Sequence, residues 1–181
     1  MAAELTREGP ESRKLRLETL VRLRWLAVGG QMATVAIVGF FMQFSMPVEI
    51  AIGLIALLAA VNAWLKFSYP ATYRLEPSSA LALLAFDLLQ LTALLYVTGG
   101  ISNPFAPLIS VPVIISSAAQ PLRYSLALVL IAMLAITALV FSPFPLPWHP
   151  GSVVPFEPLL LAGMWFAIVS TTSFAAFYAY R

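Results

Sequence analysis

Cysteine is absent from the 181-residue sequence, and charged residues make up only 10% of it. Without cysteine, the chain has no disulfide, no thiolate metal ligand and no thiol redox switch of its own. A soluble domain of this size carries about 25% charged residues. Hydrophobic residues instead make up 61% of the chain, and the mean hydropathy is +0.91. This composition leaves too little polar surface to cover a water-soluble globule, so it favours a membrane protein.

Regular alternation of apolar and polar residues is also missing, which argues against a transmembrane β-barrel. Apolar runs of roughly 20 residues recur, and a helix of that length crosses a hydrocarbon core of about 30 Å. We therefore predict an all-α, polytopic membrane protein with six transmembrane helices and an N-terminal arm that lacks the pattern of a cleavable signal peptide. The arm covers residues 1–24, and the spans are about 25–44, 48–67, 78–98, 104–120, 124–141 and 159–180. The fourth span is short and contains Pro107 and Pro112.

The lysines and arginines all fall on one side of the predicted membrane. They are Arg7, Arg13, Lys14, Arg16, Arg22, Arg24, Lys66, Arg74, Arg123 and Arg181. None lies in the predicted loops 45–47, 99–103 or 142–158. Because basic segments stay in the cytoplasm, both termini are predicted to be cytoplasmic. The net charge of +2 is too small to indicate nucleic-acid binding.

The arm mixes its bases with Leu15, Leu17, Leu20 and Leu23, and these apolar positions do not gather on one clean helical face. The simpler interpretation is a basic flank that fixes the topology. The alternative is an interfacial helix that is attracted to anionic lipid.

A break with the sequence Gly-Gly-Ile-Ser-Asn-Pro-Phe separates the third and fourth predicted spans. Gly99 or Gly100 can adopt a positive φ and end the third helix. Asn103 is a preferred N-cap, and Pro104 suits the first helical turn. These residues predict a helix stop followed by a helix start, which needs no ligand. The ring of Phe105 and a spare amide donor of Asn103 are not needed for that turn, and they suit a flat ligand with carbonyl groups.

This heptapeptide resembles the GGxxNPF heptad of the RegB/PrrB/ActS family of redox-sensing histidine kinases. Residues 19–28, and onward to Gln31, also resemble the start of that family's first span, and the resemblance covers nearly the whole chain. It implies a homodimeric sensor domain in the bacterial inner membrane that binds ubiquinone or ubiquinol. Such a domain regulates the autophosphorylation of a C-terminal histidine kinase, which acts on a response regulator in a two-component system.

Carried over by position, the resemblance implies that the heptapeptide recognises the quinone. The implied residues are Gly99, Gly100, Asn103, Pro104 and Phe105. No phosphoacceptor helix, ATP-binding domain or redox cysteine follows Arg181, so the chain resembles only the sensor half and is expected to hold no catalytic residue. The alternative is a small transporter or scaffold subunit in which the heptapeptide only closes a hairpin.

Asp87 is the one ionisable side chain predicted deep in a span, and Gln90 follows it by one turn. Such groups usually face the interior of a helix bundle. Asp87 is therefore expected to be a protonated or hydrogen-bonded packing residue, paired with Gln31, Asn62 or Gln90. The alternative is a proton-linked or coupling element of the sensor, beside the ligand pocket.

Two tryptophans and the single histidine are further candidates. Trp148 lies in the proline-rich loop 142–158 and is expected in the aromatic belt, although this loop can also fold over the heptapeptide. Trp165 is expected either in the core or in the wall of a quinone cleft. His149 is expected to be solvated, and no metal site is predicted.

Small residues recur along the sixth span at Gly163, Ala167, Ser170 and Thr171. Such spacing lets another helix approach closely. It predicts either packing within the chain or the seam of a homodimer.

Overall fold

The computed structural model describes residues 16–70, 72–149, 151 and 157–180, and these ranges contain six α-helices and no β-strand. The helices are α1 (Leu17–Ala36), α2 (Val48–Ser68), α3 (Pro77–Val97), α4 (Ser110–Ala119), α5 (Leu122–Val140) and α6 (Pro158–Tyr180). A π-helical turn at Ile37–Phe41 extends α1, and 3-10 turns at Gly100–Ser102 and Ala106–Ile109 lie between α3 and α4.

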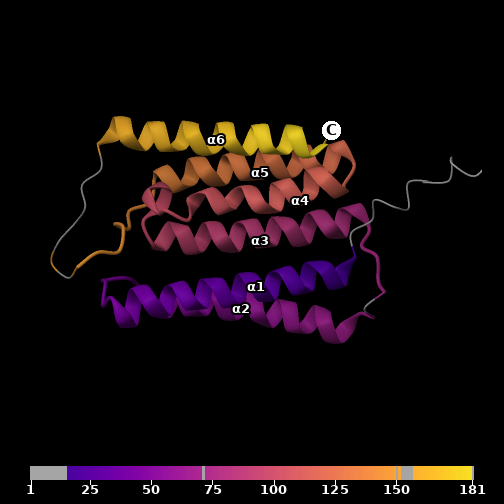
Figure 1. The fold of residues 1–181 in the computed structure, drawn as a ribbon, viewed down its shortest axis with the longest axis horizontal. Coiled ribbons are helices and arrows are strands. Elements are labelled where there is room, and N and C mark those ends of the chain that lie inside the picture. The colour runs from indigo at the N-terminus through magenta and orange to yellow at the C-terminus, as the bar shows by residue number, and fades with distance from the viewer. Residues whose placement is uncertain (1–15, 71, 150, 152–156, 181) are drawn as a thin grey trace, which may run out of the picture.

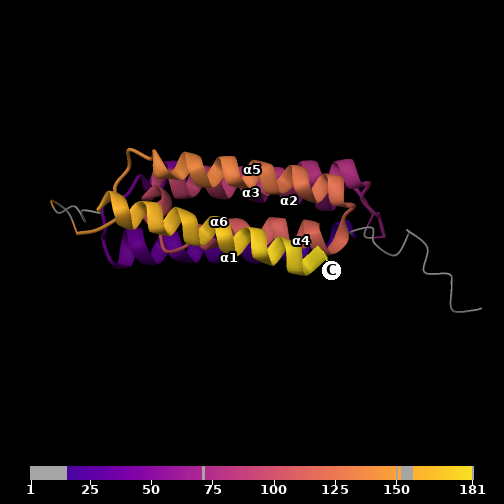
Figure 2. The ribbon, with the colours of Figure 1, turned by 90° about the horizontal axis from the view of Figure 1, so that it is seen from above.

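The helices lie side by side along the long axis and form two layers (Figures 1 and 2). One layer holds α1, α4 and α6, and the other holds α2, α3 and α5. The start of α1 and the end of α6 lie at the same end of the bundle, while the turn between α3 and α4 lies at the opposite end (Figure 1). The chain therefore runs up and down through the bundle in sequence order.

Within the described ranges, five helical segments are long and apolar enough to cross a membrane. They are Leu17–Phe41, Val48–Ser68, Pro77–Val97, Leu122–Val140 and Pro158–Ala179. The remaining apolar helix, Ala106–Ala119, is shorter, and its α-helical part begins only at Ser110. Pro107 and Pro112 explain this, since each lacks the N–H that would continue an α-helical ladder.

The first helix begins earlier than predicted. Leu17, Leu20, Val21 and Arg24 are all buried on one face of α1, at the i, i+3, i+4, i+7 spacing of an amphipathic helix. Leu23, in contrast, is 44% exposed. The described leucines of the arm therefore do not all share one face, as expected, although Leu17 and Leu20 do. The end of the arm is part of the bundle, and Leu15 lies outside the described residues.

The main core lies between α3, α4, α5 and α6, where Leu88, Ile109, Leu128 and Ile136 have no exposed surface. The first turns of α1 join this core at one end of the bundle through residues such as Leu20. Farther along, α1 and α2 share a smaller apolar cluster with one residue of α3. It comprises Val35, Ala51, Ile55 and Leu94. The α1–α2 hairpin is therefore attached to the rest of the bundle less extensively than α3–α6 are to one another.

Candidate functional site

The break after α3 is a tight turn that depends on its two glycines. Gly99 has φ +113° and Gly100 has φ +58°, which confirms the predicted helix stop. A Cβ on Gly99 would lie 2.8 Å from the Cα atom of Leu146, and one on Gly100 would overlap the carbonyl oxygen of Leu139. Both glycines are thus required by backbone conformation and by close packing against the end of α5 and the chain that follows it.

Asn103 holds the turn together through both ends of its amide. Its Nδ2 donates to the carbonyl oxygen of Thr98 at 2.8 Å and to Thr98 Oγ1 at 2.9 Å. Its Oδ1 accepts from the backbone N–H of Phe105 at 2.9 Å. The prediction of a spare amide donor is therefore wrong, because Thr98 at the end of α3 uses it. Asn103 is the C-cap of the 3-10 turn Gly100–Ser102, whereas Phe105 precedes the next 3-10 turn and Ile109 precedes α4. The prediction that Asn103 caps the fourth helix is therefore wrong.

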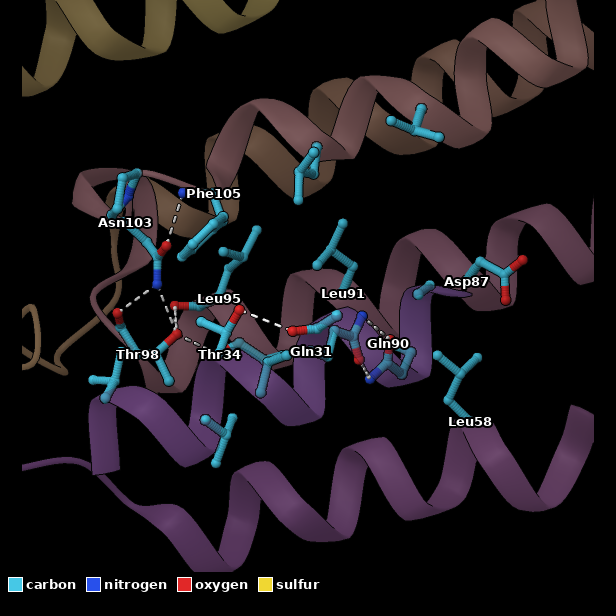
Figure 3. Close-up of a pocket in the computed structure, with 18 of the residues that line it drawn as sticks. Gln31, Thr34, Leu58, Asp87, Gln90, Leu91, Leu95, Thr98, Asn103 and Phe105 are labelled. Carbon is cyan, nitrogen blue, oxygen red and sulfur yellow. Dashed lines mark hydrogen bonds between the residues drawn. The ribbon is translucent and has the colours of Figure 1, made fainter. Parts of the chain in front are cut away.

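A cavity of about 700 Å³ lies between α1, α3 and the segment leading into α4 (Figure 3). Asn103, Pro104 and Phe105 line one end of it, and the ring of Phe105 is 44% exposed. Gly99 and Gly100 are not among the lining residues. Three of the five heptapeptide residues implied in quinone binding thus share one cavity, while the two glycines shape the turn behind them.

Leu146, Pro147 and Trp148 cover the same end of the cavity. The carbonyl oxygen of Trp148 accepts hydrogen bonds from the backbone N–H of Ser45 at 2.9 Å and from its Oγ at 3.3 Å. The rings of Phe44 and Trp148 lie 5.3 Å apart. The described part of the loop after α5 therefore folds over the heptapeptide, which is the second of the two arrangements predicted for loop 142–158. Residues 150 and 152–156 of the loop lie outside the described ranges.

His149 is exposed, and its ring lies 4.9 Å from that of Phe44. Among the described residues, no group of three or more histidines and carboxylates is arranged to hold a metal ion.

Midway along the cavity, the side chains of Gln31 on α1 and Gln90 on α3 face each other (Figure 3). Gln31 Nε2 donates to Gln90 Oε1 at 3.3 Å, and Gln90 Nε2 donates to Gln31 Oε1 at 3.1 Å. Gln90 Nε2 also lies 3.3 Å from the carbonyl oxygen of Leu54, so this pair reaches α2 as well. The two amides therefore satisfy each other across the cavity.

Asp87, beyond this amide pair, is bound by Arg24. Arg24 Nε donates to Asp87 Oδ1 at 2.7 Å and to Oδ2 at 2.9 Å, and Arg24 Nη2 lies 2.6 Å from Oδ1. Arg24 is only 3% exposed and also donates to the carbonyl oxygen of Leu83. The expected partners of Asp87 were wrong: Gln31 pairs with Gln90, and Asn62 donates to the carbonyl oxygen of Val21.

Sequence reasoning missed Arg24 as a partner, although two signals pointed to it. Arg24 follows Leu17 by seven positions and so shares its buried face. A carboxylate deep in a span also often pairs with a charged group of opposite sign inside the bundle. Together they predict an ion pair between α1 and α3.

Trp165 lies away from the cavity. Its Nε1 donates to Thr137 Oγ1 at 3.2 Å, which joins α6 to α5, and Trp165 packs against the main core. It is not among the residues that line the cavity. The structure therefore brings Asp87, Gln90 and Trp148 together with the heptapeptide and leaves Trp165 apart.

The small residues of α6 are exposed at Gly163, Ala167, Ser170 and Thr171. A Cβ on Gly163 would meet no atom within 4 Å. The prediction that these small residues pack against another helix of the same chain is therefore wrong.

Comparison with known proteins adds the family context. The family model of the PilS-like transmembrane domain, a 6TM family, matches residues 8–181. The chain is 36% identical over 166 residues to the sensor histidine kinase RegB of Cereibacter sphaeroides, which covers 92% of this chain and 36% of that protein. The RegB of Cereibacter sphaeroides strain ATCC 17023 is also 36% identical, over 43% of this chain and 17% of its own length. The chain thus spans 36% of the length of the first of these relatives. No solved structure matches the chain.

Proposed function

Because the chain belongs to the PilS-like transmembrane domain family, as a RegB-type sensor domain, we propose that it controls a histidine kinase by binding ubiquinone. It is a multi-pass protein of the bacterial inner membrane. The observation that carries the proposal is the cavity of about 700 Å³, which Asn103, Pro104 and Phe105 line at one end.

The size and wall of the cavity suit a flat, largely apolar ligand. Pockets for small molecules usually measure about 300–1,000 Å³ and combine apolar walls with a few polar groups. The exposed ring of Phe105 offers a stacking surface for a quinone headgroup. Leu108 and Val111, which are also partly exposed, continue the apolar wall along which an isoprenoid tail can leave towards lipid.

We propose that the heptapeptide contains residues that support the turn and residues that contact the ligand. Gly99 and Gly100 set the backbone, and Asn103 locks the turn with hydrogen bonds to its neighbours. Pro104 and Phe105 remain as the residues that touch the ligand. Since the amide of Asn103 is already used, we propose that it positions Phe105 rather than donating to a quinone carbonyl.

The described basic residues support a cytoplasmic location for both ends of the chain. Arg16, Arg22, Lys66, Arg74 and Arg123 lie at or near the helix ends on the side where α1 begins (Figure 1). The heptapeptide end holds no lysine or arginine among the described residues. By the positive-inside rule, the heptapeptide then faces the outer side of the membrane.

In this proposal the signal is a change in how the α1–α2 hairpin sits against α3–α6. A ligand shifts such an equilibrium only if it binds the two arrangements with different affinity. The wall of the cavity contains residues from both parts, so a ligand bound there would contact each of them and could favour one arrangement. In the full-length relatives a kinase is present, and α6 is the proposed route to it and through it to a response regulator. The exposed stripe on α6 supports a homodimer.

The test is quinone binding by the purified chain in phosphatidylcholine nanodiscs. Phe105→Ala should weaken binding about tenfold, because it removes an aromatic contact worth roughly 0.5–1.5 kcal/mol beyond its buried area. Phe141→Ala is the matched control: Phe141 is 74% exposed at the end of α5 and does not line the cavity. Absence of binding by the wild-type chain would refute the proposal, and equal binding by Phe105→Ala and wild type would refute the assigned site.

A further inference from the structure

The half of the cavity away from Phe105 contains a carboxylate that is open to it. The side chain of Asp87 is 19% exposed and lines the cavity, whereas Arg24 behind it is 4% exposed. A carboxylate can accept about four hydrogen bonds through its two oxygens. Oδ2 of Asp87 accepts only from Arg24 Nε among the described residues. Asp87 therefore keeps acceptor capacity after pairing with Arg24.

The partner of Asp87 is also incompletely satisfied. Arg24 uses Nε and Nη2 on Asp87 and on the carbonyl oxygen of Leu83. Its Nη1 is buried and has no hydrogen-bond partner among the described residues. A buried donor without an acceptor costs roughly 1–3 kcal/mol, and more when it is charged. The ion pair thus places a carboxylate with spare acceptor capacity, Asp87, beside a donor without a partner, Arg24 Nη1. Ionisable groups inside a membrane protein usually mark a functional site.

We propose that the Arg24–Asp87 pair is a second headgroup site in the cavity and that it selects the reduced, quinol form. A quinol carries O–H groups, so it can donate to Asp87 while its oxygen accepts from Arg24 Nη1 once the side chain adjusts. A quinone carries only carbonyl acceptors: one of them can accept from Arg24 Nη1, but its partial negative charge is repelled by the Asp87 carboxylate beside it, so the pair favours the quinol. This inference rests on the proposed function and adds to it the residues that distinguish the two redox forms.

The second site is separate from the position at Phe105. Asp87 precedes Thr98 by eleven residues of α3 and its C-cap, which corresponds to roughly 16 Å along the helix axis. Asn103 is hydrogen-bonded to Thr98, and Phe105 lies at this end of the cavity (Figure 3), so we infer that one headgroup does not touch Phe105 and Asp87 at once. Gln31 and Gln90 lie between the two positions and satisfy each other (Figure 3). The cavity therefore extends from the ring of Phe105 at the heptapeptide to the Arg24–Asp87 pair between α1 and α3.

The test measures the affinities of a short-tailed ubiquinone and its ubiquinol separately, with the full 181-residue chain in phosphatidylcholine nanodiscs. The variant Arg24→Gln/Asp87→Asn keeps a neutral amide pair between α1 and α3 but removes the carboxylate. We expect ubiquinol affinity to fall at least tenfold, the effect of losing a hydrogen bond to a charged group, while ubiquinone affinity stays within about twofold.

The matched control is Glu18→Gln/Arg22→Gln, which removes another arginine–carboxylate pair from α1, exposed on the helix surface. This variant should bind both redox forms as the wild type does. If Arg24→Gln/Asp87→Asn does not fold, Asp87→Glu replaces it, because it keeps the charge but moves the carboxylate by one methylene. In that variant the preference for ubiquinol should fall at least threefold.

Three results would overturn the inference. The first is an equal effect of the variant on ubiquinol and ubiquinone, and the second is no effect on either. The third is loss of wild-type ubiquinol binding in phosphatidylglycerol nanodiscs, which would assign Arg24 to a lipid phosphate. If the wild type binds neither redox form, the proposed function itself fails. If Phe105→Ala weakens binding while the Arg24/Asp87 variant does not, the proposed function survives without this second site.

Discussion

The α1–α2 hairpin and the α3–α6 unit are held in the bundle by different means. Within α3–α6, the contacts come from fully buried apolar side chains such as Leu88, Leu128 and Ile136. Between α1 and α3, two polar pairs line a cavity: Arg24–Asp87 and Gln31–Gln90. Figure 3 shows the second of these pairs. The contacts within α3–α6 are apolar and close-packed, whereas the boundary between α1 and α3 is polar and partly open to the cavity.

This difference indicates where a signal can arise. A close-packed apolar core resists gradual rearrangement, because any shift opens voids or creates overlap. A polar pair beside a cavity can exchange its partner for a ligand group without opening such voids. We therefore expect ligand-dependent change at the α1–α3 boundary, with α3–α6 moving as a unit.

The largest expected effect is at the ion pair that spans this boundary. Asp87→Leu leaves the buried guanidinium of Arg24 without its counter-charge, which should cost about 3–5 kcal/mol of unfolding free energy. The double variant Arg24→Leu/Asp87→Leu removes both charges and should regain most of that loss. The measurement is unfolding of the purified chain in detergent micelles. A double variant as unstable as Asp87→Leu would show that the loss comes from packing instead.

The second prediction tests the turn that closes the cavity. Gly100→Ala forces a side chain into a left-handed backbone conformation and against the carbonyl oxygen of Leu139. These effects should together lower the unfolding free energy by about 2–4 kcal/mol.

Gly29→Ala is the matched control, because Gly29 is helical and a Cβ there would meet nothing within 4 Å. It should be neutral or stabilising by up to about 1 kcal/mol. Equal behaviour of the two alanine variants in the same unfolding assay would contradict the account of the turn.

A smaller loss is expected from Asn103→Ala. The change leaves the N–H of Phe105 and the carbonyl oxygen of Thr98 without their side-chain partner, which should lower the unfolding free energy by about 1–2 kcal/mol. Ser102→Ala, one position earlier, should stay within about 0.5 kcal/mol. If Asn103→Ala is equally mild in thermal unfolding but abolishes quinone binding, the amide contacts the ligand after all.

The parts of this architecture that depend on local chemistry were predictable from the sequence. The apolar run lengths predict six spans, of which the fourth is short and contains prolines. The described residues form five helices long and apolar enough to cross a membrane and one shorter apolar helix at the fourth position, within a few residues of the predicted bounds except at the start of α1. Gly99 and Gly100 predict the helix stop because glycine adopts positive φ at little cost. Each of these features is decided by residues that are close together in the chain.

The parts that depend on tertiary contacts were not predictable in the same way. Arg24 and Asp87 are 63 positions apart, and their pairing requires α1 and α3 to lie in a particular register. The donor of Asn103 is used by Thr98 only because α3 ends where its last carbonyl faces the turn. The cavity itself appears only once α1, α3 and α4 are placed together. Whether quinone occupies it remains a prediction.

The smallest effect on stability is expected at the lipid-facing surface of α6, which extends the comparison beyond a single chain. Gly163→Leu adds a bulky side chain where the chain itself leaves open space, so the unfolding free energy should change by no more than about 0.5 kcal/mol. If the small-residue stripe of α6 is the dimer seam, the same change blocks close approach of the two helices and should weaken dimerisation at least tenfold.

Ala138→Leu on α5 is the control for that experiment, because Ala138 is also exposed and gains a similar apolar group. Resonance energy transfer between differently labelled chains in micelles measures the monomer–dimer equilibrium directly. Weaker dimerisation in Gly163→Leu alone would place the seam on α6, on the α3–α6 side of the molecule. Equal dimerisation in both variants would exclude that stripe and leave the α1–α2 surface as the face to examine. The outcome therefore decides whether the partner chain contacts the close-packed unit or the hairpin that borders the cavity.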